Sequence, residues 1–159
     1  MRCKEKMETY LREQQVPFEE QHHPRTFSAL TIAESEHISN KRVAKSVIIQ
    51  VDGQLMCFVV PAPYAVNLDT VRAITNAKEV RLAHEEEFEQ AFPDCEVGTM
   101  PPFGNLYGLP VYVDKSLAAE ESITFPVGTY TDTMSIKYAD FEQLAHPHIA
   151  MFARSQVAL

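Results

Sequence analysis

Two runs of β-forming residues lie on either side of Asp52-Gly53 and give the clearest pattern in the chain. Residues 43–51 and 54–60 are rich in valine, isoleucine and other side chains that favour strands. An Asp-Gly pair suits a type I′ turn, because both central residues of that turn take positive φ. The pattern therefore predicts a β-hairpin with a two-residue turn. Such a turn pairs Val51 with Gln54, Ile49 with Met56, Val47 with Phe58 and Lys45 with Val60.

Lys45 lies within the apolar face of this predicted hairpin. Because side chains alternate sides along a strand, Lys45 shares its face with Val43, Val47 and Ile49. An unpaired buried ammonium is costly, so it must find a partner, reach water or lose its proton. Two interpretations stay open on this pattern: a strand-end lysine whose head extends into solvent, and a cation at the mouth of a cleft that meets an anionic substrate group.

Short helices and strands are predicted along the rest of the chain. Apolar positions at helical spacing indicate helices, with Ser28 and Asn67 as N-caps, and β-rich runs between turn residues indicate strands. The expected helices are 5–15, 28–37, 67–75, 85–92 and 140–146; the expected further strands are 18–23, 78–82, 110–114, 123–127 and 133–138; the residues after 146 are expected to form a tail.

This mixture of elements predicts the α+β class. We expect a curved, mostly antiparallel mixed sheet or an open barrel surrounded by helices. No internal repeat or linker is visible, and 159 residues suit one domain with a sizeable core. We therefore expect a single domain over residues 1–159, with its core at about 18–146.

Composition and charge narrow the possible partners. The chain is 45% hydrophobic and 23% charged, with a net charge of −8. It has no global basic field, so if nucleic acid is a partner, a local cluster such as Lys41, Arg42 and Lys45 must contact it. The charged N-terminal residues lack the apolar core of a signal peptide, and no apolar run approaches the ~20 residues of a membrane span. We expect a cytoplasmic protein that does not enter a membrane.

The cysteines indicate neither a disulfide framework nor a zinc site. Cys3, Cys57 and Cys95 are odd in number and widely spaced, without Cys/His ligand spacing. Cys57 belongs to the predicted hairpin and is most simply a small core residue. We expect no metal and no cofactor.

The segment 98–108 is unusual because it combines three glycines with two prolines. Glycine permits positive φ and close approach to the backbone, while adjacent prolines stiffen the chain. A stiff loop of this kind can hold a polar ligand through its backbone at little entropic cost. A tight surface connection between a helix and a strand explains the same composition, and local features favour that simpler interpretation.

Three motifs together resemble the YbaK/ProX family of aminoacyl-tRNA deacylases. They are Val-Ala-Lys-Ser at 43–46, the Gly-x-x-x-Pro element at 98–102 followed by Phe103-Gly104, and Pro-Val-Tyr-Val-Asp at 110–114. The resemblance extends from about His23 to about Leu144. It implies the fold of the editing domain of prolyl-tRNA synthetase and a hydrolase that acts in trans on the ester of mischarged tRNA.

The resemblance also implies roles for individual residues. Lys45 engages the 3′ end of the tRNA, and Gly98 begins the catalytic loop that holds the terminal adenosine and the aminoacyl group. Water is activated with help from a ribose hydroxyl of the substrate, so no side-chain nucleophile is expected, and the chain has no GxSxG or HExxH motif. The implied substrate-binding residues are His23, Thr26, Ser28, Ser46, Thr99, Met100, Pro101, Pro102, Phe103, Gly128 and Asp132.

Several of these residues have structural alternatives. Ser46 points away from Lys45 in a regular strand, so it either packs under a helix or reaches the pocket through a twist or bulge. His22 and His23 equally suit a strand end that contacts solvent. Phe103 and Tyr107 either stack on the terminal adenine or pack beneath the loop. Asp114 ends a predicted strand and suits the capping of a turn. His146-Pro147-His148 lacks ligand partners and is assigned to the tail.

Two function classes remain open at this stage. The first is a trans-editing deacylase for tRNA carrying a small amino acid, of the Ala-tRNAPro or Cys-tRNAPro type, with the tRNA acceptor end as partner and an aminoacyl-tRNA synthetase as a further candidate partner. The second is a regulatory module of the same fold that binds aminoacyl-tRNA or a nucleotide without catalysis. Tyr130 keeps the second open, because several relatives carry histidine there. The sequence determines neither the amino acid removed nor the oligomeric state.

Overall fold

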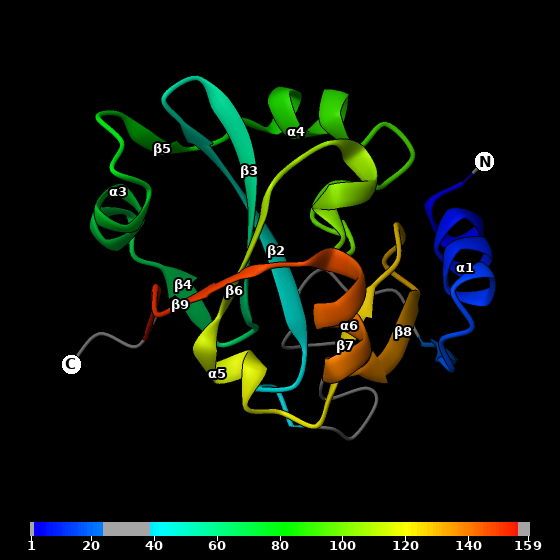
Figure 1. The fold of residues 1–159 in the computed structure, drawn as a ribbon. Helices are drawn as coiled ribbons and strands as arrows, with labels where there is room; N and C mark the ends of the chain where they lie inside the picture. The colour runs from blue at the N-terminus through cyan, green and yellow to red at the C-terminus, as the bar shows by residue number, and fades with distance from the viewer. Residues whose placement is uncertain (1, 24–38, 156–159) are drawn as a thin grey trace.

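The computed structural model describes residues 2–23 and 39–155 and confirms an α+β fold (Figure 1). Predicted elements within these ranges are present, with ends that differ from expectation by no more than two residues. The helix expected at 28–37 lies outside the described residues. The helices are α1 (Cys3–Glu13), α3 (Leu68–Thr75), α4 (Glu85–Ala91), α5 (Lys115–Ala118) and α6 (Tyr138–Ala145), with a 3-10 turn η1 (Gly104–Tyr107). The strands are β1 (Glu19–His22), β2 (Ala44–Val51), β3 (Gln54–Pro61), β4 (Tyr64–Val66), β5 (Val80–Leu82), β6 (Val111–Asp114), β7 (Ser122–Pro126), β8 (Asp132–Lys137), β9 (His148–Ala150) and β10 (Ala153–Ser155).

The strands form three sheets. The largest has the order β5-β2-β3-β6-β9, and smaller sheets have the orders β1-β8-β7 and β10-β4. Pairing is antiparallel except for β3 with β6 and β6 with β9, which are parallel. An isolated parallel bridge between Val43 and Thr124 joins the beginning of β2 to β7. The strand arrangement is therefore mixed and mostly antiparallel, as predicted.

The central hairpin has the predicted register. Val51 pairs with Gln54 and Lys45 pairs with Val60, at the two ends of an eight-residue ladder. Asp52 and Gly53 both take positive φ, 47° and 86°, which the tight turn requires. The turn also reaches the neighbouring strand, because the Asp52 carboxylate accepts a 2.8 Å hydrogen bond from the backbone N–H of Glu79.

Both faces of this hairpin are buried, against two separate apolar clusters. Ile48, Cys57 and Val59 face the larger cluster, which includes residues of α1, α6 and β7. Ile49, Phe58 and Val60 face a smaller cluster, which includes Phe152 and a residue of α3. Figure 1 shows α3 and β4 on one side of the hairpin and α1, α6 and the β7–β8 pair on the other. The hairpin thus separates two apolar clusters. Because side chains alternate sides along each strand, a residue's position in the strand determines which cluster it faces.

The expectation of a C-terminal tail was wrong. His148, assigned to that tail, begins β9, which lies parallel to β6, and β10 pairs with β4. Asp114 holds this segment in place, because its buried carboxylate accepts 2.8 Å hydrogen bonds from the backbone N–H groups of Phe152 and Ala153. The same carboxylate accepts hydrogen bonds from the N–H and the hydroxyl of Ser116, so Asp114 is also the N-cap of α5. The sequence of this segment does not show the alternation typical of a strand. Its position in the fold depends instead on contacts with these distant residues.

We expect Asp114→Ala to destabilise the fold by about 2–4 kcal/mol, because it leaves the buried N–H of Phe152 and its neighbour without an acceptor. Urea unfolding followed by circular dichroism measures the change. Asp69→Ala is the matched control: its carboxylate is 92% exposed and contacts Arg72, so we expect a loss below about 1 kcal/mol. Equal losses in the two variants would contradict the role given to Asp114.

Candidate functional site

Lys45 is half-buried on the side of the hairpin that faces α3 and β4. Its side chain lines a cavity of about 510 Å³ together with Val47, Asn67, Leu68 and other residues of this side. Within the described part of the chain it has no ion-pair partner, and burial lowers the pKa of its ammonium. This cation is incompletely solvated, and no described residue supplies it with a paired counter-charge.

Positive electrostatic features surround the Lys45 cavity. The first turn of α3 borders it, and Asn67 caps that helix by accepting hydrogen bonds from the N–H groups of Asp69 and Thr70. Arg154 of β10 also lines the cavity. Asp69 is the acidic group at this cavity, and its carboxylate pairs with Arg72 at 3.0 Å. The charges and the helix dipole around Lys45 therefore favour binding of an anion in this cavity.

Ser46 points to the opposite side of the hairpin, as expected for a regular strand. Its hydroxyl is buried next to the thiol of Cys57. Burial raises the pKa of Cys57 to about 11, and the nearby Ser46 hydroxyl reduces that rise. The packing of Ser46 inside the larger cluster matches the structural alternative left open by the sequence.

The loop at 96–99 is braced against the turn between β7 and β8. Thr99 is buried, and its hydroxyl donates a 2.6 Å hydrogen bond to the carbonyl of Glu96. The N–H of Gly128 donates to the carbonyl of Thr99, and the N–H of Glu96 donates to the carbonyl of Gly128, both at 2.9 Å. Gly98 lies between these bonds with φ of 82°, exposed and with open space around its Cα. The backbone at Gly98 is therefore both fixed and accessible.

Two residues of the 128–130 turn complete this brace. Gly128 has φ of 93°, and a Cβ there would lie 2.4 Å from the Cβ of Cys3, so no larger residue fits. The Tyr130 hydroxyl donates a short hydrogen bond to the carbonyl of Val97. The Tyr130 N–H donates to the Glu96 carboxylate at 3.0 Å. Tyr130, where this chain departs from the resembled family, thus anchors the residue before Gly98.

The side chains that follow belong to the core. Met100 is 5% exposed, Pro101 and Pro102 are buried, and Phe103 is fully buried. The Phe103 ring makes edge contacts with the rings of Tyr10, Phe125 and Phe141. These contacts account for Phe103 by packing beneath the loop, which is the alternative that the sequence left open. What the loop exposes to a ligand is its backbone at Gly98, since the backbone N–H and carbonyl of buried Thr99 are already hydrogen-bonded to Glu96 and Gly128.

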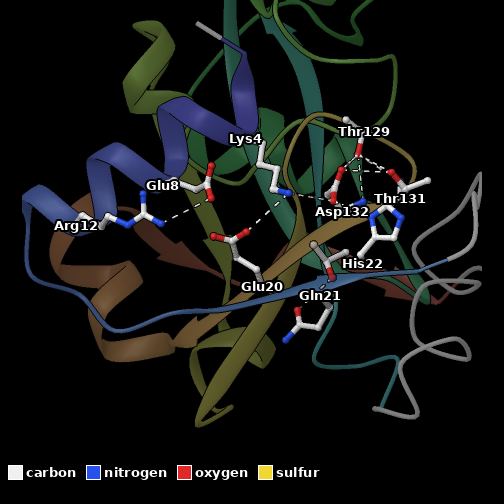
Figure 2. Close-up of polar contacts among 10 residues, drawn as sticks. Lys4, Glu8, Arg12, Glu20, Gln21, His22, Thr129, Thr131 and Asp132 are labelled. Carbon is white, nitrogen blue, oxygen red and sulfur yellow. Dashed lines mark hydrogen bonds and ion pairs between the residues drawn. The ribbon is translucent and has the colours of Figure 1, made fainter.

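Asp132, the first residue of β8, is the centre of a polar cluster (Figure 2). Its carboxylate accepts hydrogen bonds from the hydroxyl of Thr129 at 2.7 Å and from Nδ1 of His22 at 3.1 Å, and Lys4 Nζ lies at 3.3 Å. Burial alone would raise the pKa of Asp132, but these donors outweigh burial and lower the pKa to about 2. Asp132 is therefore a permanent anion with several donors around it.

A second polar strip lies on the other side of the β1-β8-β7 sheet. The Gln21 side chain accepts from the hydroxyls of Thr133 and Ser135, and Ser135 shares a 2.7 Å hydrogen bond with Thr124. This strip borders a cavity of about 520 Å³ that Arg42 also lines. His23 is buried, and alternation along β1 places it on the Gln21 side. No sequence motif marks Gln21, Thr124, Thr133 and Ser135, because isolated amide and hydroxyl side chains in strands form no recognisable pattern.

The predicted site residues fall into two groups. Lys45 lies on one side of the hairpin, and the bridge from Val43 to Thr124 continues that side onto the polar strip. The loop lies on the opposite side, since a Cβ at Gly104 would approach the Cβ of Cys57 to 2.8 Å. The structure brings Gly98, Thr99, Gly128 and Asp132 together through the brace, but it does not place Lys45 beside them. Thr26 and Ser28 lie outside the described residues.

Over residues 2–23 and 39–155, no three or more histidine, cysteine, aspartate or glutamate side chains are placed to hold a metal ion. Over the same ranges, no helix has the length and apolar content needed to cross a membrane.

Comparison with known proteins gives one family. The family model described as an aminoacyl-tRNA editing domain matches residues 23–144. The proline–tRNA ligase of Bacillus mycoides (strain KBAB4) is 29% identical over 83 residues, which are 52% of this chain and 14% of the ligase. The chain therefore corresponds to a small part of that curated relative.

Two solved structures share the fold over most of the chain. Hypothetical protein APE2540 superposes with a TM-score of 0.85 and 16% identity, over 94% of this chain and 99% of that one. A candidate trans-editing enzyme for prolyl tRNA synthetase superposes with a TM-score of 0.76 and 19% identity, over 87% of both chains. At these identities the likeness concerns the fold alone.

We expect Asp132→Asn to lower the free energy of unfolding at neutral pH by about 1–2 kcal/mol, because an amide cannot replace an anion among these donors. The pKa of Asp132 is about 2 in the folded state and about 3.9 in an unfolded chain. Its stabilisation is therefore present above about pH 4 and is lost as the pH falls toward 2. Urea unfolding of both proteins should show their difference shrinking over that interval. A difference independent of pH would contradict this assignment.

Proposed function

The chain belongs to the aminoacyl-tRNA editing domain family, and on that premise we propose that it hydrolyses the ester of mischarged aminoacyl-tRNA. The proposed substrate is a tRNA that carries a small amino acid, of the Ala-tRNAPro or Cys-tRNAPro type. The similarity to part of a proline–tRNA ligase supports tRNAPro. The reaction would occur in trans in the cytoplasm, with the acceptor end as the bound partner and a synthetase as a further candidate partner.

The observation that carries this proposal is the state of Lys45. A desolvated ammonium that has no ion-pair partner among residues 2–23 and 39–155, facing a cavity of about 510 Å³, destabilises the free protein and is compensated when an anion binds. Phosphate is the anion that every acceptor end presents. Arg154 and the first turn of α3 add to the attraction. A single strand needs few phosphate contacts, so this local site is compatible with a net charge of −8.

The braced loop supports the ester-hydrolysing part of the proposal. The reaction needs a carbonyl carbon held in place while water attacks and negative charge develops on the carbonyl oxygen. Gly98 offers an exposed backbone that is fixed by the hydrogen bonds of Gly128 and Tyr130 to its neighbours before the substrate arrives. A preorganised backbone lowers the reorganisation required during the reaction. We therefore assign phosphate binding to Lys45 and ester positioning to the Gly98 loop, on the two sides of the hairpin.

We expect Lys45→Ala to lower kcat/KM for deacylation by roughly 10- to 100-fold, the range for loss of one charge-assisted hydrogen bond. The measurement is release of amino acid from a panel of tRNAs charged with alanine, cysteine or serine. Lys45→Arg keeps the charge and should retain part of the activity. Lys115→Ala removes an exposed lysine and should leave the rate unchanged. Full activity of folded Lys45→Ala would count against the proposal, and saturable binding without turnover would favour the regulatory module.

We expect Tyr130→Phe to reduce kcat by about 2- to 10-fold with little change in KM, because it removes one neutral hydrogen bond that fixes Val97 before Gly98. Steady-state kinetics on the best substrate of the panel separate the two constants. A change confined to KM would indicate that Tyr130 contributes to tRNA binding and not to the loop's position.

A further inference from the structure

Cys3 and Cys95 are far apart in the sequence, but the fold brings their side chains together. Cys3 is the first residue of α1 and is 1% exposed, whereas Cys95 is half-buried in the segment that leads to Gly98. The two thiols hydrogen-bond with each other, and both residues line a cavity of about 700 Å³. All three cysteines of the chain are free thiols. The proposed function uses none of them.

The turn between β7 and β8 shows how closely the two segments approach each other. A Cβ on Gly128 would lie 2.4 Å from Cβ and 2.9 Å from Sγ of Cys3, and 3.5 Å from the carbonyl oxygen of Asp94. The carbonyl of Gly128 also accepts a 2.9 Å hydrogen bond from the N–H of Glu96. Cys3 therefore packs against the same glycine as the residues on either side of Cys95.

Side chains around Cys95 hold its thiol in position. Its Sγ lies 3.6 Å from the Tyr107 hydroxyl and 3.6 Å from Oδ1 of Asp94, and Tyr107 donates a 2.9 Å hydrogen bond to that same oxygen. Lys6, one turn after Cys3 on α1, pairs with the other oxygen of Asp94 at 3.3 Å. This ion pair joins α1 to the segment that carries Cys95, so the two thiols are kept together by contacts besides their own.

The two thiols differ in acidity. The hydrogen bond with Cys95 lowers the pKa of Cys3 despite burial; Tyr107 and Lys6 add to the decrease, and Asp94 opposes it. The same hydrogen bond, together with burial, raises the pKa of Cys95. A position at the beginning of a helix and a neighbouring lysine are typical of reactive cysteines, because both stabilise the thiolate. Cys3 is therefore the better nucleophile of the pair, and Cys95 supplies the second thiol.

We propose that Cys3 and Cys95 form a reversible oxidation site, at which hydrogen peroxide converts the two thiols into a disulfide. The Cys3 thiolate attacks the peroxide, and an S–O bond forms as the O–O bond breaks. The departing hydroxide takes the proton that Cys3 has lost and becomes water. The Cys95 sulfur then attacks the Cys3 sulfenic acid, so that the S–S bond forms and the S–O bond breaks. The Cys95 proton leaves with that hydroxide as a second water.

The disulfide ties the beginning of α1 to a residue three positions before Gly98. A link between positions so distant in the sequence restricts the unfolded chain, so oxidation should stabilise the fold. Thiols such as glutathione reverse the reaction by exchange with the disulfide. Oxidising conditions therefore strengthen the attachment of α1 beside the loop. This oxidation does not require deacylation, so it can be tested separately from the proposed function.

Oxidation of the full chain with hydrogen peroxide, followed by alkylation in denaturant and mass spectrometry, tests the proposal. We expect the chain to lose the mass of two hydrogen atoms and to yield a peptide of Cys3 linked to a peptide of Cys95, with Cys57 still free. Dithiothreitol should restore all three thiols. The melting temperature of the oxidised protein should exceed that of the reduced protein by roughly 5–15 °C.

Two variants separate the pair from the third cysteine. Cys95→Ser removes the second thiol, so oxidation of Cys3 should end in products that gain oxygen, without an intrachain disulfide. Cys57→Ala is the matched control: Cys57 is fully buried, and burial raises its pKa to about 11. This variant should form the disulfide at the wild-type rate.

Three results would overturn the proposal. The first is wild-type protein that keeps all of its thiols under peroxide while other proteins in the same sample are oxidised. The second is a disulfide that involves Cys57 or joins two chains instead of linking Cys3 to Cys95. The third is an intrachain disulfide that lowers the melting temperature, because the folded positions of Cys3 and Cys95 would then not accommodate the bond.

Discussion

Burial of the β2–β3 hairpin on both faces is the constraint on which the rest of the structure depends. With apolar clusters on each side, alternation along two strands assigns every side chain to one of two environments. A shift of one residue in the register would exchange them, placing Lys45 in the larger core and Ile48 at the cavity. The Asp52-Gly53 turn fixes that register. These two residues therefore determine on which side of the hairpin Lys45, the only charged residue of β2, lies.

Local chemistry explains which parts of the fold the sequence could predict. The hairpin, its register and the cap at Asn67 depend on residues within a few positions of one another, and all three were found. The C-terminal strands were missed because their order depends on Asp114, which lies 38 residues before the N–H of Phe152 that it binds. Burial of Phe152 against Phe58 is likewise a contact between distant segments. The residues adjacent in sequence to Asp114, Phe58 or Phe152 give no indication of these contacts.

The same distinction applies to the candidate site. Motif resemblance predicted roles for Lys45 and the 98–102 loop, because each of those motifs is a continuous stretch of sequence. The contact between His22 and Asp132 joins positions 110 residues apart, and it exists because β1 pairs with β8 in one register. Tyr130 looked like a departure that weakened the site, but its hydroxyl fastens Val97. The identity of residue 130 alone was therefore less informative than the hydrogen bond to Val97 that the fold gives it.

The two parts of the proposed site lie on opposite sides of one hairpin, and this separation has a physical rationale. Lys45 would gain from a phosphate because burial leaves its ammonium incompletely solvated and no ion-pair partner for it occurs among the described residues. The Gly98 loop lies on the other side of the hairpin, where Gly128 and Tyr130 brace its backbone. In the proposed reaction, phosphate binding by Lys45 and ester positioning by the loop would therefore depend on separate sets of contacts. Burial of both faces of the hairpin keeps those two sets apart.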